Sequence, residues 1–177
     1  MPRLSALVAS ASPRRFVQPS MPAFVEPQLA KLVERAPSQA GWGHEVKFDG
    51  YRLQLRVEDG EATLRTRKGL DWTPKFAAIA RQAEKLPDCM IDGEAVALDA
   101  HGAPDFAALQ AALSEGKSDD LIFFAFDLLF AEGEELRPLP LRDRKARLEK
   151  LPGGLKGKHD ALRYVEHFET AGDAVLD

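Results

Sequence analysis

Alternating apolar and polar residues predict a β-hairpin in the first third of the chain. In residues 51–57 every second side chain is apolar, as in a half-buried strand. The Asp59-Gly60 pair that follows favours a two-residue turn, so residues 61–66 are expected to return antiparallel. This hairpin gathers five cations into one region: Arg52, Arg56, Arg65, Arg67 and Lys68. They form either a solvated sheet edge or a wall that binds phosphate, since guanidinium groups match phosphate oxygens.

The stretch before the hairpin has a lysine between two carboxylates. Alternation over residues 45–49 predicts a strand with Glu45, Lys47 and Asp49 on one polar face. An ordinary half-solvated strand shows the same pattern. The functional alternative is a lysine nucleophile, because burial or nearby cations can leave a lysine amine unprotonated and reactive.

Two apolar runs predict further strands. Residues 90–98 read as a buried strand containing Asp92-Gly93-Glu94, whose two carboxylates share a face. Buried carboxylates without partners are costly, so this pair favours a role in holding a ribose hydroxyl or a divalent cation. Residues 121–130 form the most apolar run, which is too short to cross a membrane and is expected to be a central strand.

Helical spacing of apolar residues predicts three helices, over residues 73–86, 105–114 and 141–151. Thr73 is expected to cap the first, with proline in its first turn. The third is basic and amphipathic, and we expect it to be a solvated outer helix. Weaker signals predict a short helix or turn at 29–35, a strand at 162–168 and a helix capped by Thr170.

Composition indicates one globular domain. The chain has 177 residues, of which 45% are hydrophobic, and a net charge of -4, which excludes a uniformly basic nucleic-acid binder but allows a local basic patch. The single cysteine, Cys89, excludes an internal disulfide and suits a reducing compartment. Residues 1–20, rich in Ser, Pro, Ala and Arg, are expected to form a flexible tail or linker, because their apolar run is too short for a signal peptide.

The stretch Lys47-Phe48-Asp49-Gly50-Tyr51-Arg52 resembles the K-x-D-G-x-R signature of the covalent nucleotidyltransferases, the superfamily of DNA ligases, RNA ligases and messenger-RNA capping enzymes. Three further matches follow in that family's order: Thr66-Arg67-Lys68-Gly69, Asp92-Gly93-Glu94 and Phe124–Leu129. Within the superfamily the chain looks most like the ATP-dependent ligase domain of bacterial ligase D. That closer match is based on residues 24–29, 69–73 and 106–110.

The resemblance implies an α+β fold, the nucleotidyltransferase (adenylation) domain of the DNA ligase type, with antiparallel sheets flanked by helices. Residues 21–177 would be the N-terminal part of that domain. The family's E-G-x-V-x-K motif, its later lysines and its oligonucleotide-binding domain are expected beyond residue 177. We therefore expect a domain incomplete at its C-terminus, and a chain that is impaired in ligation on its own.

The implied chemistry begins with Lys47 attacking the α-phosphate of ATP, with Mg²⁺ or Mn²⁺ as cofactor, to give a lysyl-AMP intermediate. AMP then passes to the 5′-phosphate of a DNA nick. The resemblance implies these further roles: Glu45 for adenine, Arg52 for phosphate or ribose, Glu94 for ribose or metal, Asp49 for the lysine or metal, Asp92 in support, Phe126 as the adenine platform, and Arg67 with Lys68 for DNA phosphate. Phe124 would share a face with Phe126 and is the alternative platform.

The implied partners are nicked or broken duplex DNA, the end-binding protein Ku, and polymerase and phosphoesterase domains. Together they indicate DNA repair by non-homologous end joining in the bacterial cytoplasm, at the nucleoid, without a membrane. Two other classes stay open: an RNA ligase or capping-type enzyme, and a non-catalytic fragment that binds nucleotide or DNA. Transfer of labelled ATP or GTP would separate them.

Overall fold

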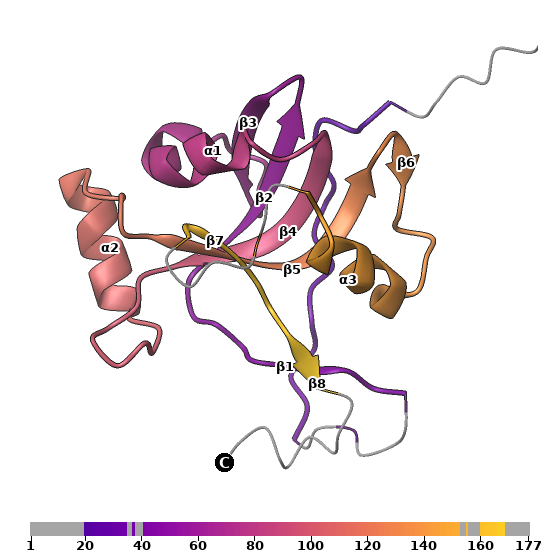
Figure 1. Ribbon diagram of the computed structural model, residues 1–177. Coiled ribbons are helices and arrows are strands. Elements are labelled where there is room, and N and C mark those ends of the chain that lie inside the picture. Colours follow the sequence, from indigo (N-terminus) through magenta and orange to yellow (C-terminus); the bar gives the residue numbers. More distant parts are fainter. Residues whose placement is uncertain (1–19, 35–36, 38–40, 153–154, 156–159, 169–177) are drawn as a thin grey trace, which may run out of the picture.

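The computed structural model describes residues 20–34, 37, 41–152, 155 and 160–168. A six-stranded sheet forms its centre, in the order β3-β2-β4-β5-β6, with β7 also paired to β5 (Figure 1). Neighbouring strands are antiparallel except for the parallel pair β5 and β7. The strands are β2 Tyr51–Glu58, β3 Glu61–Thr66, β4 Cys89–Val96, β5 Ile122–Ala131, β6 Glu134–Glu135 and β7 Leu162–Tyr164. A separate two-stranded sheet joins β1 His44–Glu45 to β8 His167–Phe168.

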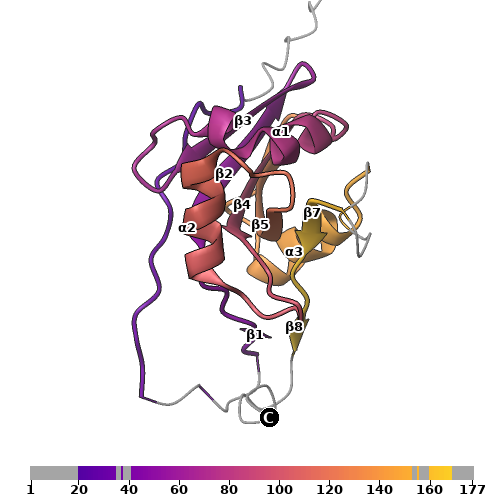
Figure 2. The ribbon, with the colours of Figure 1, turned by 90° about the vertical axis from the view of Figure 1, so that its left-hand side faces the viewer.

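The helices and the N-terminal segment lie on different sides of the large sheet (Figure 2). The helical elements are η1 Thr73–Phe76, α1 Ala77–Ala83, α2 Phe106–Glu115 and α3 Leu141–Glu149. On the opposite face, Val25 exchanges two hydrogen bonds with the side chain of Gln54, at 2.8 and 2.9 Å. Gln54 is therefore buried although it belongs to the polar face of β2. Within the described ranges, no helix is long and apolar enough to cross a membrane.

The main core lies between the sheet and the helices. Leu55, Leu64 and Phe123 of the sheet are fully buried against Ile79 of α1 and Leu109 of α2. A smaller cluster on the other face joins Met21, Met90, Leu129 and Phe130. The sheet is thus covered over part of both faces, which raises the cost of leaving any charged group on it without a partner.

The predicted hairpin is confirmed. Strands β2 and β3 pair in a continuous register from Leu53 opposite Thr66 to Glu58 opposite Glu61. The turn residues Asp59 and Gly60 have φ angles of 53° and 78°, the left-handed conformation that a tight hairpin turn requires. The strands predicted at 90–98 and 121–130 are also present, shifted by one or two residues at their ends.

The strand predicted over residues 45–49 is wrong. Only His44–Glu45 is extended in β1, and it pairs with β8. Pairing of β2 with β4 begins at Tyr51, opposite Ala95, so residues 46–49 precede the sheet and form no strand. Val46 is half exposed instead of pointing into a core. Alternation alone could not show that these residues lie beside no strand.

Two other local predictions need correction. The hydroxyl of Thr73 donates to Asp71 Oδ1 at 2.6 Å and accepts from the Leu64 amide at 2.9 Å, so it ties the chain to β3 and does not cap α1. The helix begins instead through the 3₁₀ turn η1. Residues 29–34 form no helix, and Leu32 is fully exposed. A short helix without a buried face is unstable in water.

Two predictions at the chain ends have a mixed outcome. The strand predicted at 162–168 is divided into β7 and β8 by Val165 and Glu166. The tail predicted at 1–20 lies almost entirely outside the described residues, as does the helix predicted after Thr170. The second helix, in contrast, is confirmed, and Asp105 accepts a bond from the Ala108 amide as its N-cap at 2.9 Å.

Gly93 is required where β4 passes β5. A Cβ atom at this position would lie 2.3 Å from the Phe123 ring and 2.6 Å from the Phe124 carbonyl oxygen. We predict that Gly93→Ala lowers the free energy of unfolding by about 3 kcal/mol in urea denaturation, because neither neighbour can move without disturbing the sheet. Gly43→Ala is the matched control, since its nearest contact would be an ordinary 3.5 Å. Equal stability of the two variants would contradict the prediction.

Candidate active site

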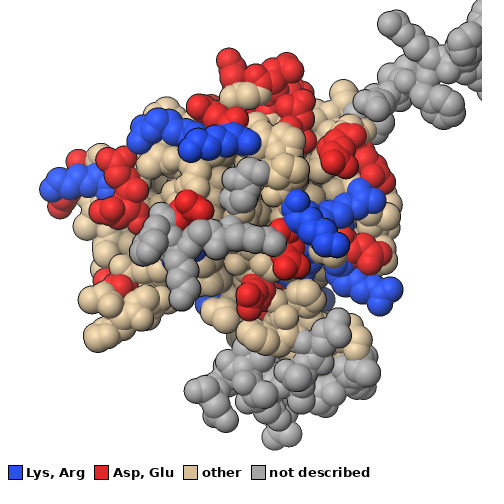
Figure 3. All heavy atoms as spheres, viewed as in Figure 1, with Lys and Arg blue, Asp and Glu red and all other residues tan. Residues whose placement is uncertain are grey.

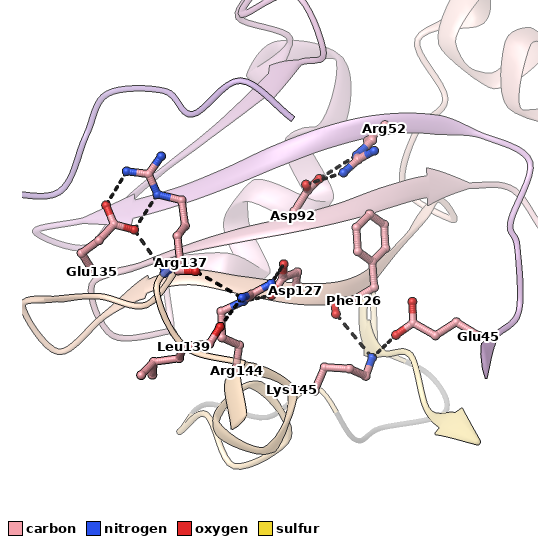
Figure 4. Close-up of polar contacts among 10 residues, drawn as sticks. All are labelled: Glu45, Arg52, Asp92, Phe126, Asp127, Glu135, Arg137, Leu139, Arg144 and Lys145. Atoms are coloured by element: carbon pink, nitrogen blue, oxygen red, sulfur yellow. Dashed lines mark hydrogen bonds and ion pairs between the residues drawn. The ribbon is translucent and has the colours of Figure 1, made fainter. Parts of the chain in front are cut away.

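A buried ion pair lies at the centre of the polar face of the sheet. Arg52 of β2 donates to Asp92 of β4 through two bonds, Nε to Oδ1 at 3.1 Å and Nη2 to Oδ2 at 2.8 Å (Figure 4). Its Nη1 donates to the Gln28 carbonyl at 2.8 Å. Its guanidinium carbon lies 5.4 Å from the centre of the Phe126 ring, within cation–π range. Arg52 therefore joins β2, β4, β5 and the N-terminal segment.

Burial and ion pairing shift the pKa of Asp92 in opposite directions. Its side chain is only 7% exposed, and burial raises the pKa of its carboxyl group above the usual value, while the bonds from Arg52 oppose that rise. The same bonds raise the pKa of Arg52, so the guanidinium is firmly charged. Asp92 thus serves mainly to hold Arg52 in place.

Glu94 links the K-x-D-G stretch to the sheet. Its Oε1 accepts a bond from the Gly50 amide at 2.9 Å. Burial is the main cause that raises the pKa of Glu94, while the Gly50 amide and the charges of Lys47 and Arg52 lower it and the charge of Asp49 raises it. Lys47 and Asp49 are exposed, and both are close enough to act on Glu94.

Steric crowding explains why the K-x-D-G stretch has a glycine at position 50. A Cβ atom on Gly50 would lie 2.2 Å from the Ala95 carbonyl oxygen and 2.8 Å from the Val96 side chain. Only glycine lets the chain approach β4 this closely before it enters β2. The approach brings the residues just before Gly50 to the edge of the Glu94 side chain.

A bulge in β5 determines which side chains face the site. Asp127 pairs with Asp92 but Ala125 pairs with Gly93, so Phe126 is the extra residue between them. Phe126 and Asp127 consequently both contact polar-face residues, although they are adjacent in sequence. Phe124, on the same face, stacks on Phe48 with ring centres 4.1 Å apart. That stacking covers Phe124, whereas Phe126 faces Arg52.

The predicted basic wall is largely used within the protein. Arg56 pairs with Glu58 at 2.6 Å, and Arg65 donates to the Gly69 carbonyl at 3.1 Å. Arg67 and Lys68 are exposed at the tip of a tight turn that the Gly69 amide closes onto Thr66. The hairpin region therefore offers two solvent-facing cations. Over the face drawn in Figure 3, acidic and basic side chains are interspersed.

A cavity of about 520 Å³ connects the turn with the sheet. Its lining includes Arg52 and Glu94 from the sheet, and Arg67 and Lys68 from the turn. It also includes Leu29, Gly50, Tyr51, Thr66, Leu70 and Trp72. Lys47, Glu45 and Phe126 do not line this cavity, but Phe126 contacts Arg52 at its border.

Two cations of α3 were not predicted as site residues. Most residues of this helix are exposed, as expected for a solvated outer helix, but Arg144 and Lys145 point inward. Arg144 donates two hydrogen bonds to the Asp127 carboxylate, from Nε at 2.8 Å and from Nη2 at 2.9 Å. Lys145 is 1% exposed and contacts Glu45 and the Phe126 carbonyl (Figure 4). Helical periodicity treats lysine and arginine as solvent-facing, but a carboxylate within the most apolar strand signalled the need for an inward cation.

The predicted site residues are therefore grouped by the structure. Arg52 contacts both Asp92 and Phe126, and the charge of Glu94 acts on Arg52. Lys145 connects Glu45 to the Phe126 carbonyl. Among the described residues no group of three or more His, Cys, Asp or Glu side chains is arranged to hold a metal ion.

The fold belongs to the nucleotidyltransferase (adenylation) domains of DNA ligases. A solved structure described as mycobacterial DNA ligase D complexed with ATP and MES aligns with 80% of this chain and 46% of that chain, with a TM-score of 0.64 and 32% identity. The ligase domain of LigD from M. tuberculosis aligns with 75% of this chain and 41% of that chain, with a TM-score of 0.60 and 32% identity. The predicted fold class is confirmed.

Sequence comparison identifies the family. The ATP dependent DNA ligase domain profile matches residues 23–174, so the chain belongs to this enzyme family, as predicted. It is 44% identical over 147 residues to the multifunctional non-homologous end joining protein LigD of Pseudomonas aeruginosa, covering 81% of this chain and 17% of that protein. It is 31% identical over 130 residues to the SPbeta prophage-derived DNA ligase-like protein LigB of Bacillus subtilis, which covers 72% of this chain and 47% of that protein. The chain spans less than half the length of each.

The Arg144–Asp127 pair should contribute strongly to stability. We predict that Arg144→Met lowers the free energy of unfolding by about 2–3 kcal/mol, because it leaves the largely buried Asp127 carboxylate without its cation. Arg142→Met, on the same helix, is the control, since Arg142 is 79% exposed and among the described residues pairs only with Asp143, at 3.5 Å. Urea denaturation of both variants measures the difference. A loss no greater than that of the control would contradict the assignment of Arg144 to the site.

Proposed function

We propose that this chain supplies the adenylation chemistry of an ATP-dependent DNA ligase acting in non-homologous end joining. The observation that supports this best is the position of Lys47, which is exposed and acts electrostatically on Glu94, beside the Arg52–Asp92 pair. A relative from P. aeruginosa is named as a non-homologous end joining protein, and a similar mycobacterial structure is described as a complex with ATP. ATP is accordingly the proposed nucleotide.

In the proposed first step, Lys47 Nζ attacks the α-phosphorus of ATP. A nitrogen–phosphorus bond forms, the bond from phosphorus to the bridging oxygen of pyrophosphate breaks, and the amine loses its proton. In the second step the 5′-phosphate of a DNA break takes AMP from the lysine. The 3′-hydroxyl then displaces AMP and closes the strand.

The polar face suggests a role for each neighbour. Phe126 offers an aromatic surface for adenine stacking, since its ring contacts only the Arg52 guanidinium among the aromatic and cation–π contacts described. Glu45 is connected to the Phe126 backbone carbonyl through Lys145 and would accept a hydrogen bond from the base. Arg52 would bind ribose or phosphate, oriented by Asp92, and Glu94 would bind ribose or metal.

Asp49 and Glu94 are the proposed donors for Mg²⁺ or Mn²⁺. Both present carboxylate oxygens, which hard divalent cations prefer. The negative charge of Asp49 contributes to raising the pKa of Glu94, so the two carboxylates repel each other and a cation between them would relieve that repulsion. Such an ion would offset negative charge on the phosphates.

The DNA side of the site is proposed at the turn of residues 66–69. Arg67 and Lys68 are exposed beside the cavity, where they can bind the 5′-phosphate of a nick. Ku, and polymerase and phosphoesterase domains, are proposed as partners in end joining. Because the proposed substrate is broken duplex DNA, the proposed place of action is the bacterial cytoplasm, at the nucleoid.

Mass spectrometry tests this function directly. After prolonged incubation with ATP and Mn²⁺, we expect the protein to gain the mass of one AMP, with the adduct on Lys47 in peptide maps.

Lys47→Arg should abolish the adduct, whereas Lys68→Arg should keep it, because Lys68 is proposed only for DNA. An adduct on another lysine would contradict the assignment. Preferential labelling by GTP would favour a capping-type enzyme, and ATP binding without any adduct would favour a non-catalytic fragment.

The two aromatic candidates should differ in nucleotide binding. We predict that Phe126→Ala weakens ATP binding by about 1–3 kcal/mol, the usual loss when a base loses its aromatic platform. Phe124→Ala should have a smaller effect, because Phe48 already covers Phe124. Titration of both variants with ATP provides the measurement. A larger loss for Phe124→Ala would assign the platform to Phe124 instead.

A further inference from the structure

Lys145 is a buried cation whose donors are all in use. It lies within α3 and is 1% exposed. Its Nζ donates to the Glu45 carboxylate, to the Val165 carbonyl at 2.9 Å and to the Phe126 carbonyl at 3.3 Å. An ammonium group has three donors, so these three acceptors satisfy it. They come from three separate parts of the chain: β1, β5 and the segment between β7 and β8.

The contact leaves Glu45 with one oxygen for a ligand. Lys145 binds Oε1, and in the described part of the chain no donor is bound to Oε2. The Glu45 side chain is 31% exposed, so this oxygen can be reached from solvent. The same lysine also binds the backbone of Phe126. Lys145 therefore fixes a free acceptor at a set position relative to the proposed base platform.

A fixed carboxylate oxygen distinguishes purine bases by their edges. Adenine has an exocyclic amino group, which donates a hydrogen bond. Guanine has a carbonyl oxygen at the same ring position, which accepts one and would be repelled by the carboxylate. Sites built to hydrogen-bond one group discriminate against a ligand that lacks it, because a polar group is then left unpaired.

We propose that Lys145 is a positioning residue that determines the preference for adenine over guanine, by holding the Glu45 carboxylate beside Phe126. This inference rests on the proposed function, in which the base stacks on Phe126. Lys145 touches neither the base nor the reacting phosphate. If its role were only to stabilise the fold, its loss would weaken both nucleotides equally.

The test measures dissociation constants for ATP and GTP by NMR titration of the 177-residue chain and its variants. Lys145→Met keeps an unbranched side chain that is one atom shorter and removes the charge, so the partly exposed Glu45 can turn towards water. We expect ATP binding to weaken roughly tenfold, as for one lost hydrogen bond to a charged group. GTP binding should not weaken, and it should tighten to the extent that the fixed carboxylate repels guanine. The preference for ATP should then largely disappear.

Arg147→Met is the matched control. Arg147 lies on the same helix, is 44% exposed and pairs with Glu134 on the outside of the molecule. Its replacement should leave both dissociation constants unchanged. Lys145→Met variants that keep the ATP preference, or lose affinity for both nucleotides equally, would overturn the inference while the proposed function stands. Equal affinities in the unmodified protein would overturn it as well.

Glu45→Ala keeps the inference testable if Lys145→Met does not fold, which its amide spectrum would show. Because Lys145 is proposed to act through Glu45, loss of the carboxylate must remove the same ATP preference, and a retained preference would overturn the inference. If both single variants fold, the double variant should be no less selective than either, because the two residues act as one unit. Absence of any nucleotide binding by the unmodified protein would contradict the proposed function itself.

Discussion

The structure depends on one constraint: charges on the covered polar face of the sheet must have partners. Three such pairs meet there, Arg52 with Asp92, Arg144 with Asp127 and Lys145 with Glu45. Each joins segments that are far apart in sequence, and removing one member would leave its partner's charge without compensation in a partly buried position. The pairs therefore hold β1, the sheet and α3 in a single arrangement.

The charged groups of this face divide into two kinds. The members of the three ion pairs are used within the protein, and they orient the backbone and the Phe126 ring. In the part of the chain that the structure describes, Lys47, Asp49, Arg67 and Lys68 form no internal ion pair and face solvent. Groups of the second kind are free to bind phosphate, metal or DNA, and the first kind keeps their surroundings fixed. This division explains how one face can be both part of the fold and the proposed reaction site.

Periodicity and turn chemistry predicted the hairpin, the two long strands and the capped α2, because these features depend on local patterns. The family followed from motifs at fixed spacing. Three features escaped prediction. The bulge at Phe126 depends on how β5 pairs with β4, which no local pattern encodes. The side chains of Arg144 and Lys145 point inward because they pair with carboxylates elsewhere in the chain. The strand predicted at 45–49 alternates correctly but precedes the point where β2 joins β4.

The most direct test of this account is a crystal structure of the protein with ATP and a divalent cation. The account predicts the adenine ring stacked on Phe126, with its amino group towards Glu45 and the α-phosphate beside Lys47 Nζ. Stacking on Phe124 with Phe48 displaced would contradict the platform assignment. ATP bound away from the polar face of β2, β4 and β5 would contradict the central claim that this face is the adenylation site.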